Sequence, residues 1–334
     1  MQAVRLHGKA DLRVEEVARP DAPADGEVLL AVSAGGICGS DLHNYRTGAW
    51  ITRAPSVAGH EVTGQVTALG ADVTHVAVGD RVIVDSRFVC GRCAACADGL
   101  GQVCEALGFI GEAIDGGFAE AVLLPARNVL KAPDGVPDRH LAMAEPLAVA
   151  LHALERLAAP AGAGIVIAGC GPIGALVALL AARRGHPLHL IDLNPARVAT
   201  VAAQTGASVT DLDALGGLRF RHAVDTTGSG AVASALVETL GGAGRLALVG
   251  IGSPAPVIDP TFLVEREIAL LGCHAFTDDE LAEIGRMLPS LSPRLDAFIA
   301  DEIALGDVPA RYESLLSGEI AGIKTIIDCT RHGR

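Results

Sequence analysis

The chain has 334 residues, half of them hydrophobic, and a net charge of −13. A single hydrophobic core stops growing below this length, so we expect two domains. The negative charge is spread along the chain and argues against nucleic acid and anionic membranes as partners. Gly, Pro or charged residues interrupt the longest apolar stretches, and no leader segment precedes the first predicted strand. A cytoplasmic protein with no membrane span is therefore expected.

From the N-terminus, short apolar runs over residues 4–34 alternate with turn sequences such as Arg19-Pro20-Asp21. This pattern predicts short antiparallel strands, and residues 62–89 continue it. Glycines inside these runs permit bends in the strands. The first part of the chain is therefore predicted to fold as a partly closed β-barrel.

Candidate zinc ligands stand in two glycine-flanked segments of this region, Cys38 in the first and His60 and Glu61 in the second. A thiolate, an imidazole and a carboxylate are ligand types that zinc takes. Cys38 and His60 are too far apart in sequence for a zinc-finger loop, so the fold must assemble the site, as it does in enzymes. We predict a catalytic zinc site; the alternative for Cys38 alone is a small buried hydrophobic residue.

Four further cysteines share one glycine-rich loop over residues 90–104: Cys90, Cys93, Cys96 and Cys104. Four thiolates complete a tetrahedral zinc site with no open position, which is a structural arrangement. An iron–sulfur cluster is the main alternative, but the bacterial motif has a shorter last gap and a following proline, where this chain has Glu105. Unliganded packing thiols are a further alternative, although such a loop offers little core for them to fill.

Near residue 140 the pattern changes from strands to an apolar helix, in which Pro146 is tolerated at the first turn. Glu145 is a carboxylate within this apolar segment. Because a buried acid has to be paired, capped or metal-bound, we predict that Glu145 lies at the catalytic metal site or next to its ligands.

From residue 164 onward, strands alternate with helices. A buried strand at 164–168 leads into a glycine-rich turn and an Ala/Leu-rich helix, and the next strand ends in Asp192. This order predicts a dinucleotide site, with the pyrophosphate at the helix N-terminus and the carboxylate on the ribose hydroxyls. The predicted cofactor-binding residues of the turn are Gly169, Gly171, Pro172, Ile173 and Gly174.

Asp192 would repel a 2′-phosphate, so NAD is predicted in preference to NADP. Arg197, one turn into the following helix, is a candidate to meet a phosphate or to cover the adenine. Later strands at 222–226, 245–249 and 268–271 predict a six-stranded, doubly wound sheet. We expect a cofactor domain at 149–274 and a catalytic domain formed by 1–148 and 275–334, which includes an amphipathic helix over 277–288.

In this order and spacing, the motifs resemble those of the zinc-containing medium-chain dehydrogenase/reductase family over nearly the whole chain. The resemblance rests on the Cys38-Gly39-Ser40-Asp41-x-His43 run, the Gly59-His60-Glu61 run, the four-cysteine loop and the glycine-rich turn. Glu145 stands where classical alcohol dehydrogenases carry a third cysteine ligand. Polyol and threonine dehydrogenases share this replacement of the cysteine by glutamate. Several runs are similar to those of L-idonate 5-dehydrogenases and sorbitol dehydrogenases. The resemblance implies an α/β protein with a GroES-like catalytic domain and a Rossmann domain.

The resemblance also implies roles for individual residues. Cys38 and His60 would be zinc ligands, with Glu61 and Glu145 as the third ligand and its water-mediated or exchangeable partner, in an order that the sequence leaves open. Ser40 would accept the substrate hydroxyl proton and pass it, through the nicotinamide ribose, to His43, although both could be ordinary loop residues. One catalytic zinc, one structural zinc, NAD and a homotetramer or dimer are implied.

The expected activity is zinc-dependent, NAD-linked oxidation of a secondary hydroxyl on a polyol or sugar acid. Ala275 stands where such relatives often carry an arginine, and Asn44 where a tyrosine is common, so the pocket departs from theirs. The alternatives are a threonine or aminocyclitol dehydrogenase of the same family and, from another class, a non-catalytic cofactor-binding protein.

Overall fold

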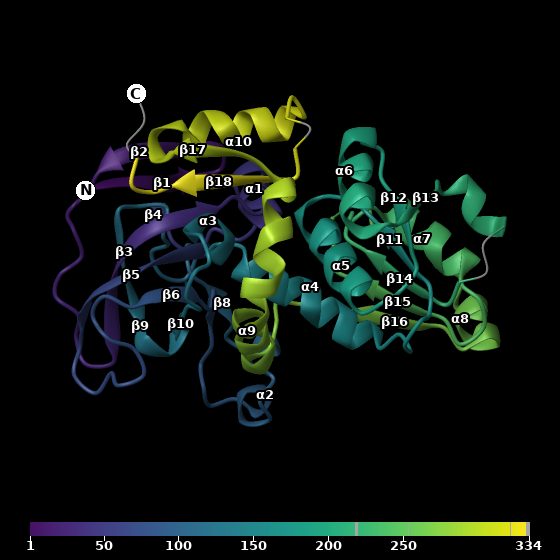
Figure 1. Cartoon of the computed structure of the whole chain (residues 1–334), viewed down its shortest axis with the longest axis horizontal. Coiled ribbons are helices and arrows are strands. Elements are labelled where there is room, and N and C mark those ends of the chain that lie inside the picture. Colours follow the sequence, from purple (N-terminus) through teal and green to yellow (C-terminus); the bar gives the residue numbers. More distant parts are fainter. Residues whose placement is uncertain (218–219, 253, 321, 332–334) are drawn as a thin grey trace. The chain divides into compact units, whose positions relative to one another are not determined.

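The computed structural model describes residues 1–217, 220–252, 254–320 and 322–331. It divides into two compact units (Figure 1). Unit 1 contains Met1–Glu145, Thr277–Ile320 and the segment that starts at Lys324, and unit 2 contains Pro146–Phe276 with Gly322 and Ile323. Among the described residues, no helix has the length and apolar character needed to cross a membrane.

Unit 1 is built on β-sheets. Its largest sheet has seven strands in the order β10-β6-β5-β3-β18-β17, with β9 also paired to β3. A three-stranded sheet has the order β2-β1-β4, and β7 pairs with β8. The strands are β1 (Gln2–Gly8), β2 (Asp11–Glu16), β3 (Glu27–Gly36), β4 (Ser56–Val57), β5 (Glu61–Leu69), β6 (Arg81–Val84), β7 (Arg87–Phe88), β8 (Gly108–Phe109), β9 (Ala121–Pro125), β10 (Val129–Lys131), β17 (Ile299–Ala304) and β18 (Lys324–Asp328).

The core of unit 1 follows from alternation along these strands. In β3, Val28, Leu30 and Val32 are buried, while the residues between them are partly exposed. Such alternation places one face of a sheet on a hydrophobic core. β3 is also a long central strand, paired with β5, β9 and β18, so segments far apart in sequence meet along it.

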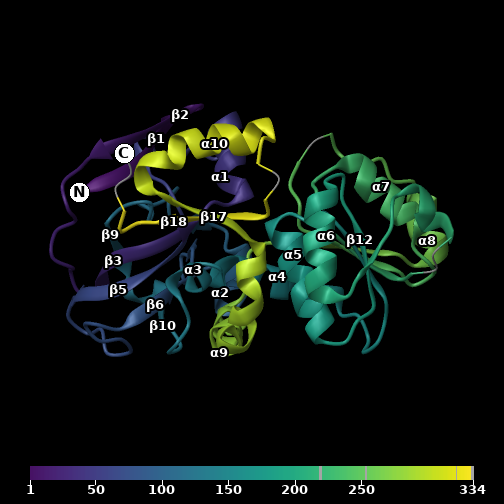
Figure 2. The ribbon, with the colours of Figure 1, turned by 45° about the horizontal axis from the view of Figure 1, so that its top comes forward.

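The helices of unit 1 are short, apart from one. They are α1 (Gly39–Thr47), α2 (Ala94–Ala97), α3 (Asp138–Leu141), α9 (Asp278–Leu295) and α10 (Val308–Ser317), and α4 (Ala144–Leu157) begins at the unit boundary. In both ribbon views α10 lies beside β17 and β18 (Figures 1 and 2). The strand-like reading of the N-terminal region overlooked α1. Helix α9 also runs past the predicted end at 288, through Pro289 and Pro293.

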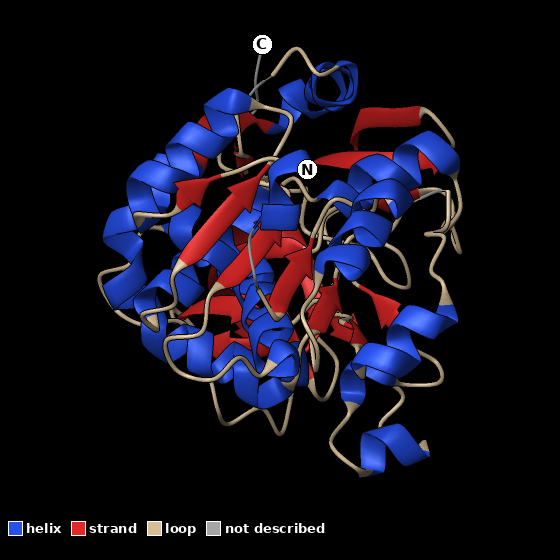
Figure 3. Ribbon diagram, turned by 90° about the vertical axis from the view of Figure 1, so that its right-hand side faces the viewer, coloured by secondary structure: helices blue, strands red, loops and turns tan. Residues whose placement is uncertain are grey.

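Unit 2 is a doubly wound α/β unit. Its six parallel strands have the order β13-β12-β11-β14-β15-β16, with helices on both sides of the sheet (Figure 3). Five of these strands match the predicted segments, and β13 was not predicted from the sequence. The elements are β11 (Ile165–Ala168), α5 (Pro172–Arg183), β12 (Leu188–Ile191), α6 (Pro195–Thr205), β13 (Ser208–Val209), β14 (His222–Asp225), α7 (Gly230–Thr239), β15 (Arg245–Leu248), α8 (Pro260–Arg266) and β16 (Ala269–Gly272).

Candidate metal and cofactor sites

The first candidate metal group is formed by Cys38, His60 and Glu61. One ligand atom from each lies within 4.8 Å of the others, and His60 and Glu61 are buried. Strand pairing explains the meeting, because Glu61 at the start of β5 is registered opposite Gly36 at the end of β3, two residues before Cys38. A thiol, an imidazole and a carboxyl at this spacing fit a zinc ion, with room left for a fourth ligand.

A buried cation lies against this group. Lys324, at the start of β18, forms an ion pair with Glu61, and both side chains are 1 % exposed. Its ammonium also donates a hydrogen bond to the Ile37 carbonyl at 2.9 Å. Burial opposes the charge on Lys324, but Glu61, Cys38 and Asp41 outweigh it and raise the pKa of Lys324. A Cβ on Gly36 would lie 2.2 Å from Glu61 Oε2, so a glycine is needed beside the pair.

Asp41, on α1, orients the imidazole of His60. Its Oδ1 lies 3.2 Å from His60 Nδ1, while its Oδ2 accepts a hydrogen bond from the backbone N–H of Cys38. A carboxylate on the second ring nitrogen fixes the tautomer of a metal-binding histidine and leaves Nε2 for the metal. Burial disfavours the protonated imidazole, but Asp41 and Cys38 outweigh burial and raise the pKa of His60.

The predicted proton-relay residues also lie on α1. Ser40 Oγ is 3.5 Å from His60 Nε2, which places it at the edge of the metal group. The ring of His43 lies one turn further along and stacks against Trp50, with 4.5 Å between ring centroids. Ser40 and His43 are each partly exposed.

Glu145 is buried near the metal group without belonging to it. Its Oε1 accepts a hydrogen bond from Ser86 Oγ at 2.7 Å. Burial, reinforced by the nearby Glu61 carboxylate, raises the pKa of Glu145 to about 7, although His60, Ser86 and Lys324 act in the opposite direction. The geometry therefore places Glu61 among the candidate ligands and Glu145 outside them.

The second candidate metal group contains all four cysteines of the 90–104 loop, whose sulfur atoms lie within 4.8 Å of one another. Backbone N–H groups of Cys90 and Ala106 point at Cys104 Sγ, at 3.3 and 3.4 Å. Hydrogen bonds from the backbone of Arg92 and Cys93 lower the pKa of Cys90 to about 6. Backbone donors of this kind stabilise thiolates, the form in which cysteine binds zinc.

The glycine-rich turn in unit 2 joins β11 to α5. Gly169 has a φ of +94°, which favours glycine. A Cβ on Gly174 would lie 1.8 Å from the Gly169 carbonyl oxygen, whereas nothing lies within 4 Å of one on Gly171. Gly171 is the N-cap of α5, followed by Pro172 and Ile173, so backbone N–H groups and open space occur together at a helix N-terminus. This combination suits a phosphate group.

The acid at the end of β12 is held beside this turn. Asp192 Oδ2 accepts a hydrogen bond from the Cys170 N–H at 2.6 Å, and Oδ1 accepts one from the Asn194 N–H at 2.7 Å. Each carboxylate oxygen keeps a free lone pair for a ligand hydroxyl. Arg197 donates through Nε to the Gly322 carbonyl at 3.1 Å, so part of its guanidinium is already engaged within unit 2.

Comparisons with known proteins agree with this geometry. Residues 24–134 match the family model of the alcohol dehydrogenase GroES-like domain. The chain is 30 % identical to L-galactonate-5-dehydrogenase of Escherichia coli over 87 % of this chain and 88 % of that protein, and 32 % identical to sorbitol dehydrogenase of Bacillus subtilis over 83 % of each. The crystal structure of L-idonate 5-dehydrogenase from Escherichia coli superposes with a TM-score of 0.89 at 26 % identity, covering 98 % of this chain and 97 % of that chain.

The chain belongs to the zinc-containing medium-chain dehydrogenase/reductase family, in its polyol dehydrogenase branch. It is an alcohol or polyol dehydrogenase with a GroES-like domain and a Rossmann-type sheet, as the motifs predicted. Membership accounts for the two ligand groups and for the glycine-rich turn in one chain.

Several residues that complete the dehydrogenase site were not identified from the sequence as parts of it. Asp41 stands in the quoted family run, one turn after Cys38, yet its contact with His60 depends on the β3–β5 pairing. Lys324 is a lone cation in the apolar strand β18, which is the one sequence feature that could have marked a buried ion pair. Ser86 has no such distinguishing feature.

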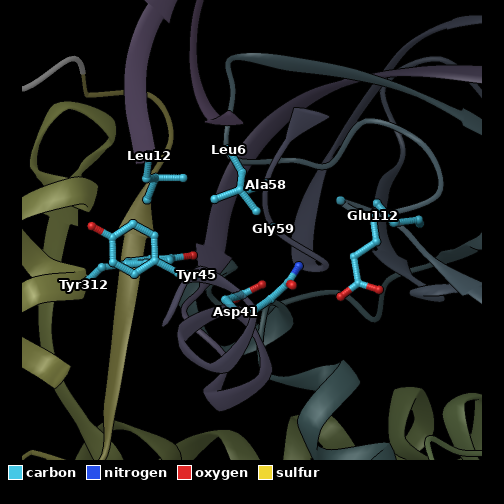
Figure 4. A pocket seen from close by; sticks show the side chains of 11 residues that line it. Leu6, Leu12, Asp41, Tyr45, Ala58, Gly59, Glu112 and Tyr312 are labelled. Carbon is cyan, nitrogen blue, oxygen red and sulfur yellow. The ribbon is translucent and has the colours of Figure 1, made fainter. Parts of the chain in front are cut away.

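Unit 1 contains a small pocket that Asp41 helps to line. In Figure 4, Tyr45 and Tyr312 lie on one side of it, Glu112 lies on the other, and Asp41 lies between them. Its remaining lining residues are Leu6, Leu12, Asn44, Ala58, Gly59, Ile110 and Gly111. The pocket adjoins the candidate metal group, because Gly59 precedes His60 and Asp41 contacts it.

Proposed function

We propose that this dehydrogenase uses zinc and NAD to oxidise a secondary hydroxyl of a polyol or sugar-derived substrate. The observation that carries the proposal is the convergence of Cys38, His60 and Glu61 from separate segments onto one point. A purely structural role would not need three different donor types, since closed structural sites are usually built from cysteine and histidine.

Zinc at this site would act as a Lewis acid that lowers the pKa of the substrate hydroxyl. The protein's own residues hold the reacting groups. Asp41 accepts the hydrogen bond of the His60 Nδ1–H group, which keeps Nε2 of His60 available. Lys324 holds the Glu61 carboxylate in place. Glu145, which accepts a hydrogen bond from Ser86 and lies outside the ligand group, would be the exchangeable partner of Glu61 at the metal.

Residues of α1 would remove the proton of the substrate hydroxyl. Ser40 Oγ, at the edge of the metal group, would accept the hydroxyl proton, and His43 would carry it to solvent. NAD would bind to the turn of Gly169, Gly171, Pro172, Ile173 and Gly174, with Asp192 on its ribose. Because Arg197 is partly engaged by Gly322, we favour NAD over NADP.

The test is a panel of polyols, aldonates and amino alcohols assayed with NAD and NADP by absorbance of the reduced cofactor. We expect NAD-linked turnover that is lost in Cys38→Ala and His60→Ala. His7→Ala is the matched control, because this imidazole on β1 is paired with Glu15 outside both ligand groups. Correctly folded Cys38→Ala protein that keeps NAD-linked activity would contradict the mechanism. Metal analysis should give two zinc ions per chain.

We also propose that the enzyme is a homo-oligomer. Unit 2 exposes large apolar side chains at Ile251, Val257 and Val264, which a partner subunit could cover. Light scattering on the purified protein tests this directly, with a monomer as the contrary result.

A further inference from the structure

No described residue pairs with one of the two carboxylates that line the small pocket. Among the described residues, neither a hydrogen bond nor an ion pair reaches the side chain of Glu112, which is only partly exposed. The neighbouring loop acid Asp115 differs: it pairs with Arg53 and accepts a hydrogen bond from the Val57 N–H at 2.9 Å. Burial raises the pKa of Glu112 to about 7. Burying part of a carboxylate without a cation costs free energy, and a cationic ligand would supply the missing charge partner.

A second polar group of the pocket is also unsatisfied. Tyr312 is 1 % exposed, and within the part of the chain that the structure describes its hydroxyl has no hydrogen-bond partner. The ring packs edge-on against Tyr45, with 5.6 Å between centroids. Buried hydroxyls are normally hydrogen-bonded. An unsatisfied hydroxyl and an unpaired carboxylate lining one pocket indicate a ligand that carries hydrogen-bond donors.

The charge of the pocket narrows the class of ligand. Asp41 and Glu112 both line it, and no lysine or arginine does among the described residues. The charged groups that shift the pKa of Glu112 are His60 and Asp41. Next to Glu112, a carboxylate or phosphate would meet like charge, whereas an ammonium group would be attracted.

We propose that Glu112 is a specificity-determining residue: with Asp41 and the Tyr312 hydroxyl, it forms a subsite that selects alcohols bearing an ammonium group over otherwise identical alcohols bearing a carboxylate. This inference rests on the proposed dehydrogenase function and adds the charge of the substrate to it. Uncharged polyols fall between the two classes, because their hydroxyls donate hydrogen bonds without bringing a charge. Two relatives named above take their names from aldonates, L-galactonate and L-idonate, which belong to the class that this subsite would disfavour.

The test uses three ligands that differ at one position: a 1-amino-1-deoxyalditol, the alditol and the aldonate of one configuration. For the wild-type enzyme with NAD at mildly alkaline pH, kcat/KM should fall in that order. Glu112→Gln should lower the amine-to-aldonate ratio by about tenfold, and Glu112→Lys should reverse the preference. Glu319→Gln is the matched control, since Glu319 is an exposed acid of unit 1 away from the pocket.

Calorimetric dissociation constants for the same three ligands should show the same order, which tests the subsite independently of turnover. A wild-type preference for the aldonate, or a Glu112→Gln variant that changes all three ligands equally, would overturn the subsite while leaving the dehydrogenase function intact. Absence of turnover on every alcohol, with the ammonium ligand still bound most tightly through Glu112, would instead contradict the proposed function alone.

Discussion

Replacing Lys324 by methionine should strongly destabilise unit 1. The substitution removes the ammonium that pairs with Glu61 and donates to the Ile37 carbonyl, and it leaves the carboxylate 1 % exposed and without that cation. Methionine keeps most of the side-chain volume, so the change tests charge more than packing.

The expected size follows from the burial of both partners. Breaking a buried ion pair by removing one partner costs about 3–5 kcal/mol, because an uncompensated charge stays in the interior. Removing both charges avoids this penalty, and replacing a whole buried pair is often close to neutral. We therefore expect Lys324→Met to lower the free energy of unfolding by about 3–5 kcal/mol, and the double variant with Glu61→Gln to regain at least about 1 kcal/mol of that loss.

The assay is urea unfolding of zinc-free protein, in which no metal compensates Glu61, for the wild type, both single variants and the double variant. The chain has a single tryptophan, and Trp50 lies in unit 1. Its fluorescence therefore follows the unit that contains the pair, and linear extrapolation gives the free energies. A loss below about 1 kcal/mol for Lys324→Met, or single losses that simply add in the double variant, would refute the assignment of a strongly coupled buried pair.

Three further predictions concern other contacts. Asp41→Asn should reduce metal affinity or kcat by about 10- to 100-fold through loss of the anionic acceptor on the ligand imidazole, as measured by zinc titration and kinetics. Arg139 lowers the pKa of Asp296 to about 2. This carboxylate therefore contributes stability above its unfolded pKa near 3.8 that is lost as the pH falls toward 2, and Asp296→Asn should flatten the acid limb of stability against pH. Gly174→Ala should weaken NADH binding in a fluorescence titration, because its Cβ would strike the turn carbonyl at 1.8 Å.

Local sequence motifs were enough to predict most of the fold and both ligand groups. Cys90, Cys93, Cys96 and Cys104 could be grouped from sequence because their spacing within one loop limits how far apart they can lie. The dinucleotide-binding turn could also be predicted from the sequence, since a glycine pattern between a buried strand and an apolar helix is typical of few other sites.

Long-range contacts could not be predicted in this way. Lys324 meets Glu61 across more than 260 positions, because β18 pairs with β3 and β3 pairs with β5. No local pattern encodes that register, whose specification depends on which face of each strand is buried. Helix α1 was overlooked for a related reason: its residues are mostly polar, so apolar periodicity gives no signal over 39–47.

The two glutamates at the metal group show what the structure adds to a motif. From sequence, the order of Glu61 and Glu145 as the third ligand and its exchangeable partner stayed open. The structure separates them by their partners: Glu61 has a cation beside it and lies with Cys38 and His60, whereas Glu145 accepts a hydroxyl hydrogen bond and has a raised pKa. A carboxylate held beside a fixed lysine is suited to permanent ligation, and one whose raised pKa favours the neutral form is suited to exchange. This difference in partner chemistry supports assigning Glu61 as the ligand.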